Sequence, residues 1–207
     1  NITMITGTSD AAAILGVTQR QVQNAVKDGL LTAHRIGNTL AVYERQVFAL
    51  RRMELTGRPW GRDTVIAALD LLSSSSVTTV RGSQLSRLKS KLSTISDAEL
   101  AGRVLAGNVT LYRATAEQQR SIASVLTNQT ALVGGGTSVI VDHDADRAAR
   151  TLGLHSDPEG NVVAINGDPR HLDVIEALAF IVYGSTRERS AGSAWLEARR
   201  TTGVNRS

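Results

Sequence analysis

The chain begins with a pattern typical of two short helices joined by a tight turn. Residues 11–15 are all apolar, Gly16 follows them, and a second helical period starts directly afterwards. Ser9 is expected to cap the first helix, and Thr18 with Gln21 forms a T-x-x-Q capping box that starts the second. The spacing therefore predicts a helix-turn-helix near the start of the sequence.

The second predicted helix has an apolar side and a polar side. Val22, Ala25 and Val26 lie on the apolar side. They are expected to pack on apolar residues of the first helix and the turn, namely Ala13, Ile14, Leu15 and Val17. The polar side carries residues at i, i+3, i+4 and i+7, namely Arg20, Gln23, Asn24 and Lys27. Gly29 is expected to end this helix.

A β-hairpin is predicted after the two helices. Residues 32–36 and 39–43 have strand-like patterns, and Gly37-Asn38 between them is a turn sequence. A helix over residues 44–52 should follow, with Val47, Phe48 and Leu50 facing the core of this region. The order of helix, turn, helix and hairpin predicts a winged helix-turn-helix.

The remainder of the chain is predicted to be a mixed α+β region. A Gly/Pro-rich hinge at residues 57–62 separates an N-terminal domain of residues 1–56 from a second domain of residues 63–207. Helices of the second domain are expected at residues 63–72, 83–92, 96–107, 115–126, 147–152, 171–183 and 186–200. Strands are expected at residues 109–113, 132–133, 138–141 and 162–165. The last helix should direct its apolar residues toward one surface, namely Ala191, Ala194, Trp195 and Ala198. The predicted fold class is α+β.

The net charge of +4 belongs entirely to the first part of the sequence. Residues 1–62 contain eight Lys and Arg against four Asp and Glu, whereas residues 63–207 contain fifteen residues of each sign. A basic domain joined to a neutral one is typical of a protein that binds DNA through the first and another partner through the second.

The polar side of the second helix has the chemistry of a DNA-reading surface. Arg, Gln and Asn form paired contacts with guanine and adenine in the major groove, whereas other cations contact phosphates without reading sequence. We therefore predict binding to duplex DNA. The expected contact residues are Thr18, Gln19, Arg20, Gln23, Asn24, Lys27, Arg35 and Arg45. The alternative is a helical hairpin whose polar side is only solvated.

Three stretches of the N-terminal region occur together in a known type of DNA-binding domain: residues 9–18 with Gln21-Val22, residues 27–31 and residues 35–37. On these residues, the segment 8–47 resembles the MerR/excisionase type of winged helix-turn-helix. The resemblance implies the fold and binding to duplex DNA, and it does not identify a target sequence.

Residues 57–60, 157–163 and 183–192 resemble the C-terminal region of actinobacterial AbiE-type antitoxins. In that family a winged-helix antitoxin represses its own operon, and its C-terminal part counteracts a nucleotidyltransferase-like toxin made from the neighbouring gene. The resemblance therefore implies an autoregulating antitoxin with two partners, the operator DNA of its own operon and the toxin protein. A palindromic operator would call for a homodimer, although no heptad pattern supports one.

One segment of the second domain could be catalytic. Residues 134–136 are glycines whose backbone N–H groups could contact a phosphate, and nearby carboxylates could hold Mg²⁺. An enzyme built here would be an atypical phosphotransferase that uses Mg-ATP to modify the toxin, with Ser138, Asp142, Asp144 and Asp146 as its catalytic residues. No lysine follows the glycines, so the segment is not a P-loop.

The sequence favours a simpler interpretation of the same segment. The glycines form a hairpin loop, and Asp142 or Asp144 caps the helix predicted at residues 147–152. On this interpretation the protein is not an enzyme and needs no cofactor.

Several other classes of protein are disfavoured by the composition. The chain has no Cys, and its four His residues lack a metal-binding spacing, so no metal site is predicted. The apolar run at residues 177–183 is too short to span a bilayer, and residues 1–8 lack the features of a signal peptide, so we expect a cytoplasmic protein without a membrane partner. A ligand-sensing repressor stays open as an alternative, because the second domain could contain a pocket that the sequence does not reveal.

Overall fold

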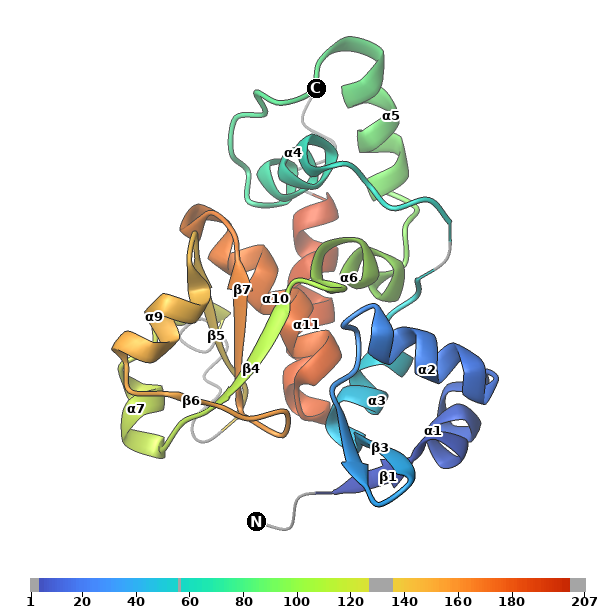
Figure 1. The fold of residues 1–207 in the computed structure, drawn as a ribbon. Coiled ribbons are helices and arrows are strands. Elements are labelled where there is room, and N and C mark those ends of the chain that lie inside the picture. The colour runs from blue at the N-terminus through green and yellow to red at the C-terminus, as the bar shows by residue number, and fades with distance from the viewer. Residues whose placement is uncertain (1–3, 56, 127–135, 202–207) are drawn as a thin grey trace.

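A three-stranded antiparallel sheet and three helices are formed by the first part of the chain (Figure 1). In this computed structural model residues 4–55, 57–126 and 136–201 are described. The elements are β1 (Ile5–Gly7), α1 (Thr8–Leu15), α2 (Gln19–Lys27), β2 (Ala33–Ile36), β3 (Thr39–Tyr43) and α3 (Glu44–Arg51). The strand order is β1-β3-β2, so the N-terminal strand extends the predicted hairpin by a third strand.

A four-stranded sheet surrounded by helices is formed by the rest of the described chain. Its elements are α4 (Arg62–Leu72), α5 (Gly82–Leu92), α6 (Asp97–Leu105), β4 (Val109–Arg113), α7 (Ala116–Arg120), β5 (Ser138–Asp142), α9 (Ala145–Thr151), β6 (His155–Ser156), β7 (Val162–Asn166), the 3-10 turn η1 (Pro169–His171), α10 (Leu172–Tyr183) and α11 (Thr186–Arg199). The strand order is β5-β7-β4-β6, with β5 and β7 parallel and the other neighbours antiparallel. With 53% helix and 15% strand, the predicted α+β class is confirmed.

The four-stranded sheet is buried on both faces. Val139 and Val141 of β5 belong to the main core, which contains α10, whereas Ile140 belongs to a second core that contains α9. Strand β7 alternates in the same way between the two cores. Because helices cover both faces, these strands are continuous apolar runs in the sequence rather than alternating ones.

Helix α10 is the central helix of the main core. All nine residues from Val174 to Val182 are buried, including Glu176, and a helix that is apolar on all sides has to be covered on all sides. Helices α6 and α11 and strand β5 pack around it. Over the described parts of the chain, no helix is both long and apolar enough to cross a membrane.

The contact face of α11 differs from the predicted one. The buried positions are Glu188, Gly192 and Leu196. Of the predicted apolar residues, Trp195 packs against the main core, whereas the prediction is wrong for Ala194 and Ala198, which are exposed. The reason is the close approach of α11 to α10: a Cβ atom on Gly192 would lie 2.5 Å from the carbonyl oxygen of Ala177. The face of α11 that packs therefore combines the glycine that permits this close approach with the fully buried Leu196.

Three smaller predictions are corrected by the structure or lie outside it. Helix α1 starts at Thr8 with Gly7 as its N-cap, because β1 leads directly into it, so Ser9 does not cap this helix. The helix predicted at residues 115–126 ends at Arg120. The strand predicted at residues 132–133 lies outside the described residues.

Helix α3 connects the two parts of the chain. Its Ala49 lies in the main core, whereas Val47 lies in the core formed by α1 and α2. The backbone N–H of Glu54 donates to the carbonyl oxygen of Ala98 on α6, at 2.9 Å. The segment before the predicted hinge at residues 57–62 is thus attached to the second part of the chain. The division into two domains at that hinge stays a prediction.

Candidate nucleic-acid interface

Helices α1 and α2 are held together by a small apolar core. Its buried members are Ala11, Ala12, Val22, Ala25, Leu31, Val42 and Val47. The buried positions of α1 are 8, 11 and 12, and Ile14 and Leu15 are half-buried against the same core. Ala13 and Val17, which were also predicted to pack, are exposed. Gly16 joins the helices with a φ of +68°, a conformation that glycine adopts with little cost.

Both ends of α2 follow the predicted signals. The Thr18 hydroxyl oxygen accepts from the N–H of Gln21 at 3.3 Å, and the Gln21 side-chain oxygen accepts from the N–H of Thr18 at 2.8 Å, so the capping box is confirmed. After the helix, Gly29 has a φ of +75°, and the N–H of Leu30 donates to the carbonyl oxygen of Ala25 at 2.8 Å. Local hydrogen bonds therefore fix where α2 begins and ends.

The outward side of α2 carries the four polar residues of the predicted stripe. Val22 and Ala25 are buried on the inward side. The exposed residues are Arg20, Gln23, Asn24 and Lys27. Within residues 4–55, 57–126 and 136–201, none of their side chains has a hydrogen-bond or ion-pair partner. Their donors and acceptors are thus available to a ligand of this surface.

Thr18 and Gln19 are exposed but have intramolecular partners. Thr18 takes part in the capping box, and the Gln19 side-chain nitrogen donates to the hydroxyl of Thr8 at 2.7 Å. This bond ties the first turn of α2 to the first turn of α1. Through these bonds Thr18 and Gln19 hold the start of α2 in place relative to α1.

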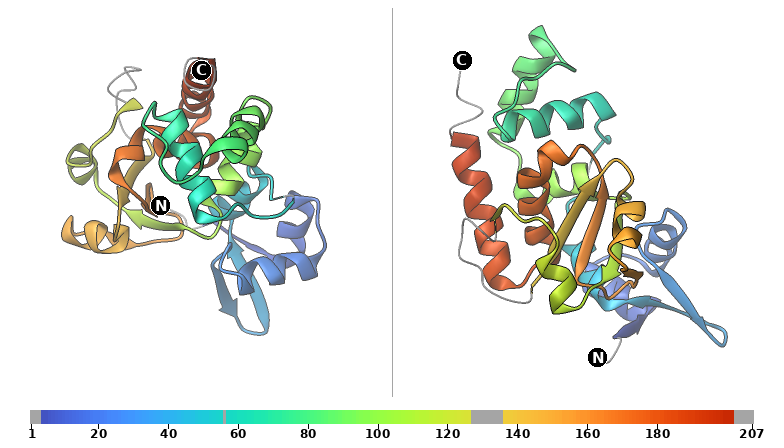
Figure 2. Two further views of the ribbon diagram at one scale, coloured as in Figure 1. Left: turned by 90° about the horizontal axis from the view of Figure 1, so that it is seen from above. Right: turned by 90° about the vertical axis from the view of Figure 1, so that its left-hand side faces the viewer.

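The hairpin β2–β3 projects away from the rest of the molecule (Figure 2). Arg35 is exposed on β2, which is the edge strand of the sheet. The turn is made by Gly37, with a φ of +59°, and Asn38. Arg35 is therefore placed where a second contact with an elongated ligand can be made.

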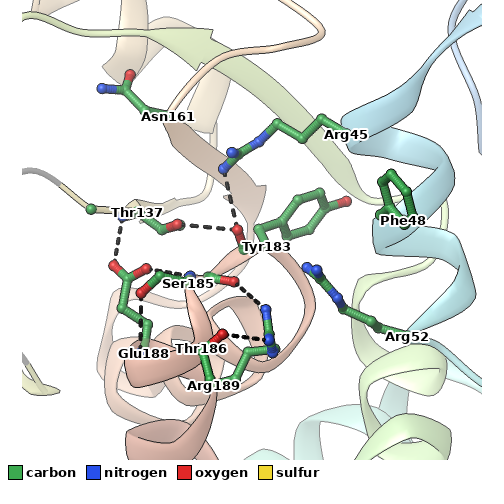
Figure 3. A pocket seen from close by; sticks show the side chains of 12 residues that line it. Arg45, Phe48, Arg52, Thr137, Asn161, Tyr183, Ser185, Thr186, Glu188 and Arg189 are labelled. Carbon is green, nitrogen blue, oxygen red and sulfur yellow. Dashed lines mark hydrogen bonds between the residues drawn. The ribbon is translucent and has the colours of Figure 1, made fainter. Parts of the chain in front are cut away.

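Arg45 does not lie with the other predicted DNA-contact residues. Its guanidinium group points toward the end of α10, where Nη2 donates to the carbonyl oxygen of Tyr183 at 3.4 Å (Figure 3). Burial lowers the pKa of Arg45, and the nearby charge of Glu159 partly offsets this effect. Arg45 shares a cavity with Arg52 and Arg189. Sequence reasoning did not single out the latter two, because nothing local in the sequence indicates that α3 and α11 meet.

The predicted phosphotransferase residues do not converge. Asp144 is the N-cap of α9, as the simpler interpretation predicted, and Asp142 accepts from the backbone N–H of Asp144 at 2.9 Å. Asp146 accepts from the Tyr112 hydroxyl at 2.9 Å. Ser138 stands at the opposite end of β5 from Asp142. Among the described residues no three His, Cys, Asp or Glu side chains are grouped as metal ligands, and two of the three glycines lie outside those residues.

In comparisons with known proteins, no protein-family model, no curated protein and no solved structure matches this chain.

Proposed function

We propose that this protein is a DNA-binding transcriptional repressor that reads duplex DNA through the outward side of α2. The observation that carries the proposal is the stripe of four exposed polar side chains at helical spacing, on a helix whose other side is packed. In this proposal the domain is a winged helix-turn-helix and the β2–β3 hairpin is its wing. The excess of positive charge in residues 1–62 supports the same assignment.

The dimensions of α2 suit the major groove. With its side chains an α-helix is roughly 10–12 Å in diameter, and the major groove is about 12 Å wide. Arg20 lies in the first turn, which is the part of a recognition helix that contacts base edges. The polar groups of Thr18 and Gln19 and the N–H groups at the helix start are suited to phosphate oxygens.

Replacing Arg20 by Ala should weaken binding to the preferred DNA by about 1–3 kcal/mol, or roughly five- to 150-fold. The reason is the loss of a paired donor contact with a base. The preferred DNA is obtained by selecting a random duplex pool with the wild-type protein, and affinities are then measured by fluorescence anisotropy at one fixed salt concentration.

Arg147→Ala is the matched control for this variant. Arg147 is exposed on α9, and its loss removes the same charge from another surface. Affinity should stay within about twofold of the wild type in this control, and it should fall with increasing salt in all three proteins because phosphate contacts release counterions. Equal losses in both variants, or failure of the pool to enrich, would refute the proposal.

We extend the proposal to residues 63–207 as the part that binds and neutralises a toxin protein. The balanced charge of this region favours a protein partner over a second nucleic-acid contact, and the resemblance to AbiE-type antitoxins points to the product of the neighbouring gene. Neutralisation by binding is favoured over phosphorylation, since Ser138 and the three aspartates do not form one site.

Mixing the purified protein with the product of its neighbouring gene should yield a stable complex in which both chains keep their masses. The measurement is native and denaturing mass spectrometry, with and without Mg-ATP. A partner that gains the mass of a phosphate or nucleotide only with Mg-ATP would instead establish an enzymatic antitoxin. The absence of any complex or modification would leave DNA binding as the sole proposed activity.

A further inference from the structure

A cavity of about 610 Å³ lies where α3 meets the corner between α10 and α11. Its volume falls in the range of roughly 300–1,000 Å³ typical of small-molecule sites. Three arginines line it: Arg45 comes from α3, Arg52 is the C-cap of α3, and Arg189 comes from α11 (Figure 3). The cavity is thus shared between the helix that closes the DNA-binding part and the last two helices of the chain.

The arginines have a structural role that accounts for part of this arrangement. Each donates to one carbonyl oxygen at the C-terminal end of α10. Arg52 Nη1 lies 2.7 Å from the oxygen of Val182, Arg45 Nη2 lies 3.4 Å from that of Tyr183, and Arg189 Nη1 lies 3.0 Å from that of Gly184. A helix end carries unpaired carbonyls and about half a negative charge, so cations are favourable there.

Capping of α10 does not balance the charge of three guanidinium groups. No carboxylate of the described residues lies within 4.0 Å of any of them. Glu188, which also lines the cavity, uses its two oxygens for the backbone N–H groups of Thr137 and Ser185, both at 2.7 Å. The cavity therefore contains three cations and one carboxylate that is already engaged.

The surroundings of the arginines confirm the imbalance. Burial lowers the pKa of Arg52, and the neighbouring charges of Arg189 and Arg45 lower it further. The Nε atom of Arg45 is buried and has no hydrogen-bond partner among the described residues. A bound anion would offset the repulsion between the guanidinium groups.

Helix α11 begins at the same cavity. Its cap Ser185 and first residue Thr186 are lining residues, so the positive end of a 14-residue helix faces the same space as the guanidinium groups. The Ser185 hydroxyl accepts from the N–H of Glu188 in a capping box, so the N–H groups of the first turn that are left to a ligand are those of Thr186 and Arg187. Arginine forks and a helix N-terminus are the two groups that proteins use most directly for phosphate.

We infer that this cavity binds the phosphate group of a small phosphorylated metabolite. Arg45, Arg52, Arg189 and the N-terminus of α11 hold the phosphate, and Phe48, which is 37% exposed at the cavity, covers the organic part. Phe48 was predicted to face the core. Its exposure at a charged cavity is explained if Phe48 contacts the organic part of the ligand. Any effect of the ligand on DNA binding, through the shared helix α3, rests on the proposed function.

Inorganic phosphate and AMP are the probes for this site, titrated into DNA-free protein at constant ionic strength. The signals are the arginine Nε–H resonances in ¹H–¹⁵N spectra. We expect one saturable site with a Kd on the order of 1 mM or tighter, and shifts in the resonances of Arg45, Arg52 and Arg189. AMP should bind more tightly than inorganic phosphate because Phe48 contacts its organic part.

Two exposed arginines outside the cavity, Arg51 and Arg147, provide control variants. Arg52→Gln and Arg189→Gln should weaken phosphate binding at least about tenfold, whereas Arg51→Gln and Arg147→Gln should leave it within about twofold. Gln is chosen because it keeps an N–H donor for the carbonyl oxygens of α10. If Arg52→Gln folds poorly, Arg52→Lys is measured instead, because Lys keeps the positive charge and lacks the guanidinium group.

The results separate a metabolite site from its alternatives. Equal losses in all four Gln variants would indicate nonspecific charge attraction and would overturn the inference, as would the absence of saturable shifts in the wild type. A third outcome is that the wild type shows no phosphate site, while Arg52→Gln binds DNA more weakly than the wild type in phosphate-free buffer. This result would overturn the inference and would indicate that the cavity binds a phosphate of the DNA backbone. Because the titration contains no DNA, it can succeed or fail independently of the proposed repressor function.

Discussion

Replacing Glu176 by Ala should destabilise the folded protein by about 3–5 kcal/mol. Glu176 lies on the central helix α10 and is 1% exposed. Its two carboxylate oxygens accept from the backbone N–H groups of Val125 and Leu126, both at 2.8 Å, and from the hydroxyl of Ser124. Ala removes all of these acceptor contacts and leaves a cavity in the apolar core. Urea unfolding followed by circular dichroism measures the loss.

Two further variants separate hydrogen bonding from charge and volume. Glu176→Gln keeps one acceptor oxygen and nearly the same volume, so its loss should be intermediate between those of the wild type and the Ala variant. Glu197→Ala removes a carboxylate whose side chain is 76% exposed on α11, and it should change stability by no more than about 0.5 kcal/mol. A Glu176→Ala protein as stable as Glu197→Ala would show that the buried carboxylate does not hold residues 124–126.

Replacing Gly192 by Ala should lower stability by about 1–3 kcal/mol, although Ala is the better helix former. A Cβ atom at this position would lie 2.5 Å from the carbonyl oxygen of Ala177 and 3.1 Å from a side-chain carbon of Ile181. The carbonyl belongs to the backbone of α10, so α11 as a whole would have to shift. Thermal unfolding should show a decrease in Tm of roughly 2–4 °C for each kcal/mol.

Ala194→Gly is the matched control for this substitution. Ala194 is exposed two residues further along α11, where only helix propensity is at stake, and Gly should cost about 1 kcal/mol there. If close packing limits the side chain at position 192, then Ala lowers stability relative to Gly at 192, whereas Gly lowers stability relative to Ala at 194. An increase in stability on Gly192→Ala would show that α11 does not depend on close approach to α10.

The helix pair α10–α11 links these stability predictions to the proposed phosphate site. Both the carbonyls capped by the arginines and the N-terminus of α11 belong to the corner between the two helices. A shift of α11 in Gly192→Ala would move Arg189 relative to Arg52. The same variant is therefore expected to weaken phosphate binding while it leaves the outward side of α2 unchanged.

The features that could be predicted from the sequence are those fixed by neighbouring residues. The capping box of Thr18 and Gln21, the turn at Gly16, the hairpin at Gly37 and the N-cap Asp144 each depend on bonds within a few residues. The outward stripe of α2 follows from helical spacing once that helix exists. The prediction of Ser9 as a cap was wrong because the start of α1 is set by a contact that is distant in the sequence. Strand β1 pairs with residues 41–43 of β3 and leads directly into α1.

The amino-acid sequence by itself determined α2, the β2–β3 hairpin and the surface that α2 presents, because helix ends, turns and side-chain phase arise from local bonds and steric preferences. The tertiary structure alone decided that Arg45 lies away from the predicted DNA-contact residues, in a cavity with Arg52 and Arg189. It also decided that Gly192 lies on the face of α11 that packs against α10. These arrangements depend on packing between helices that are distant in the chain, and no local pattern encodes which arginines such packing will bring together.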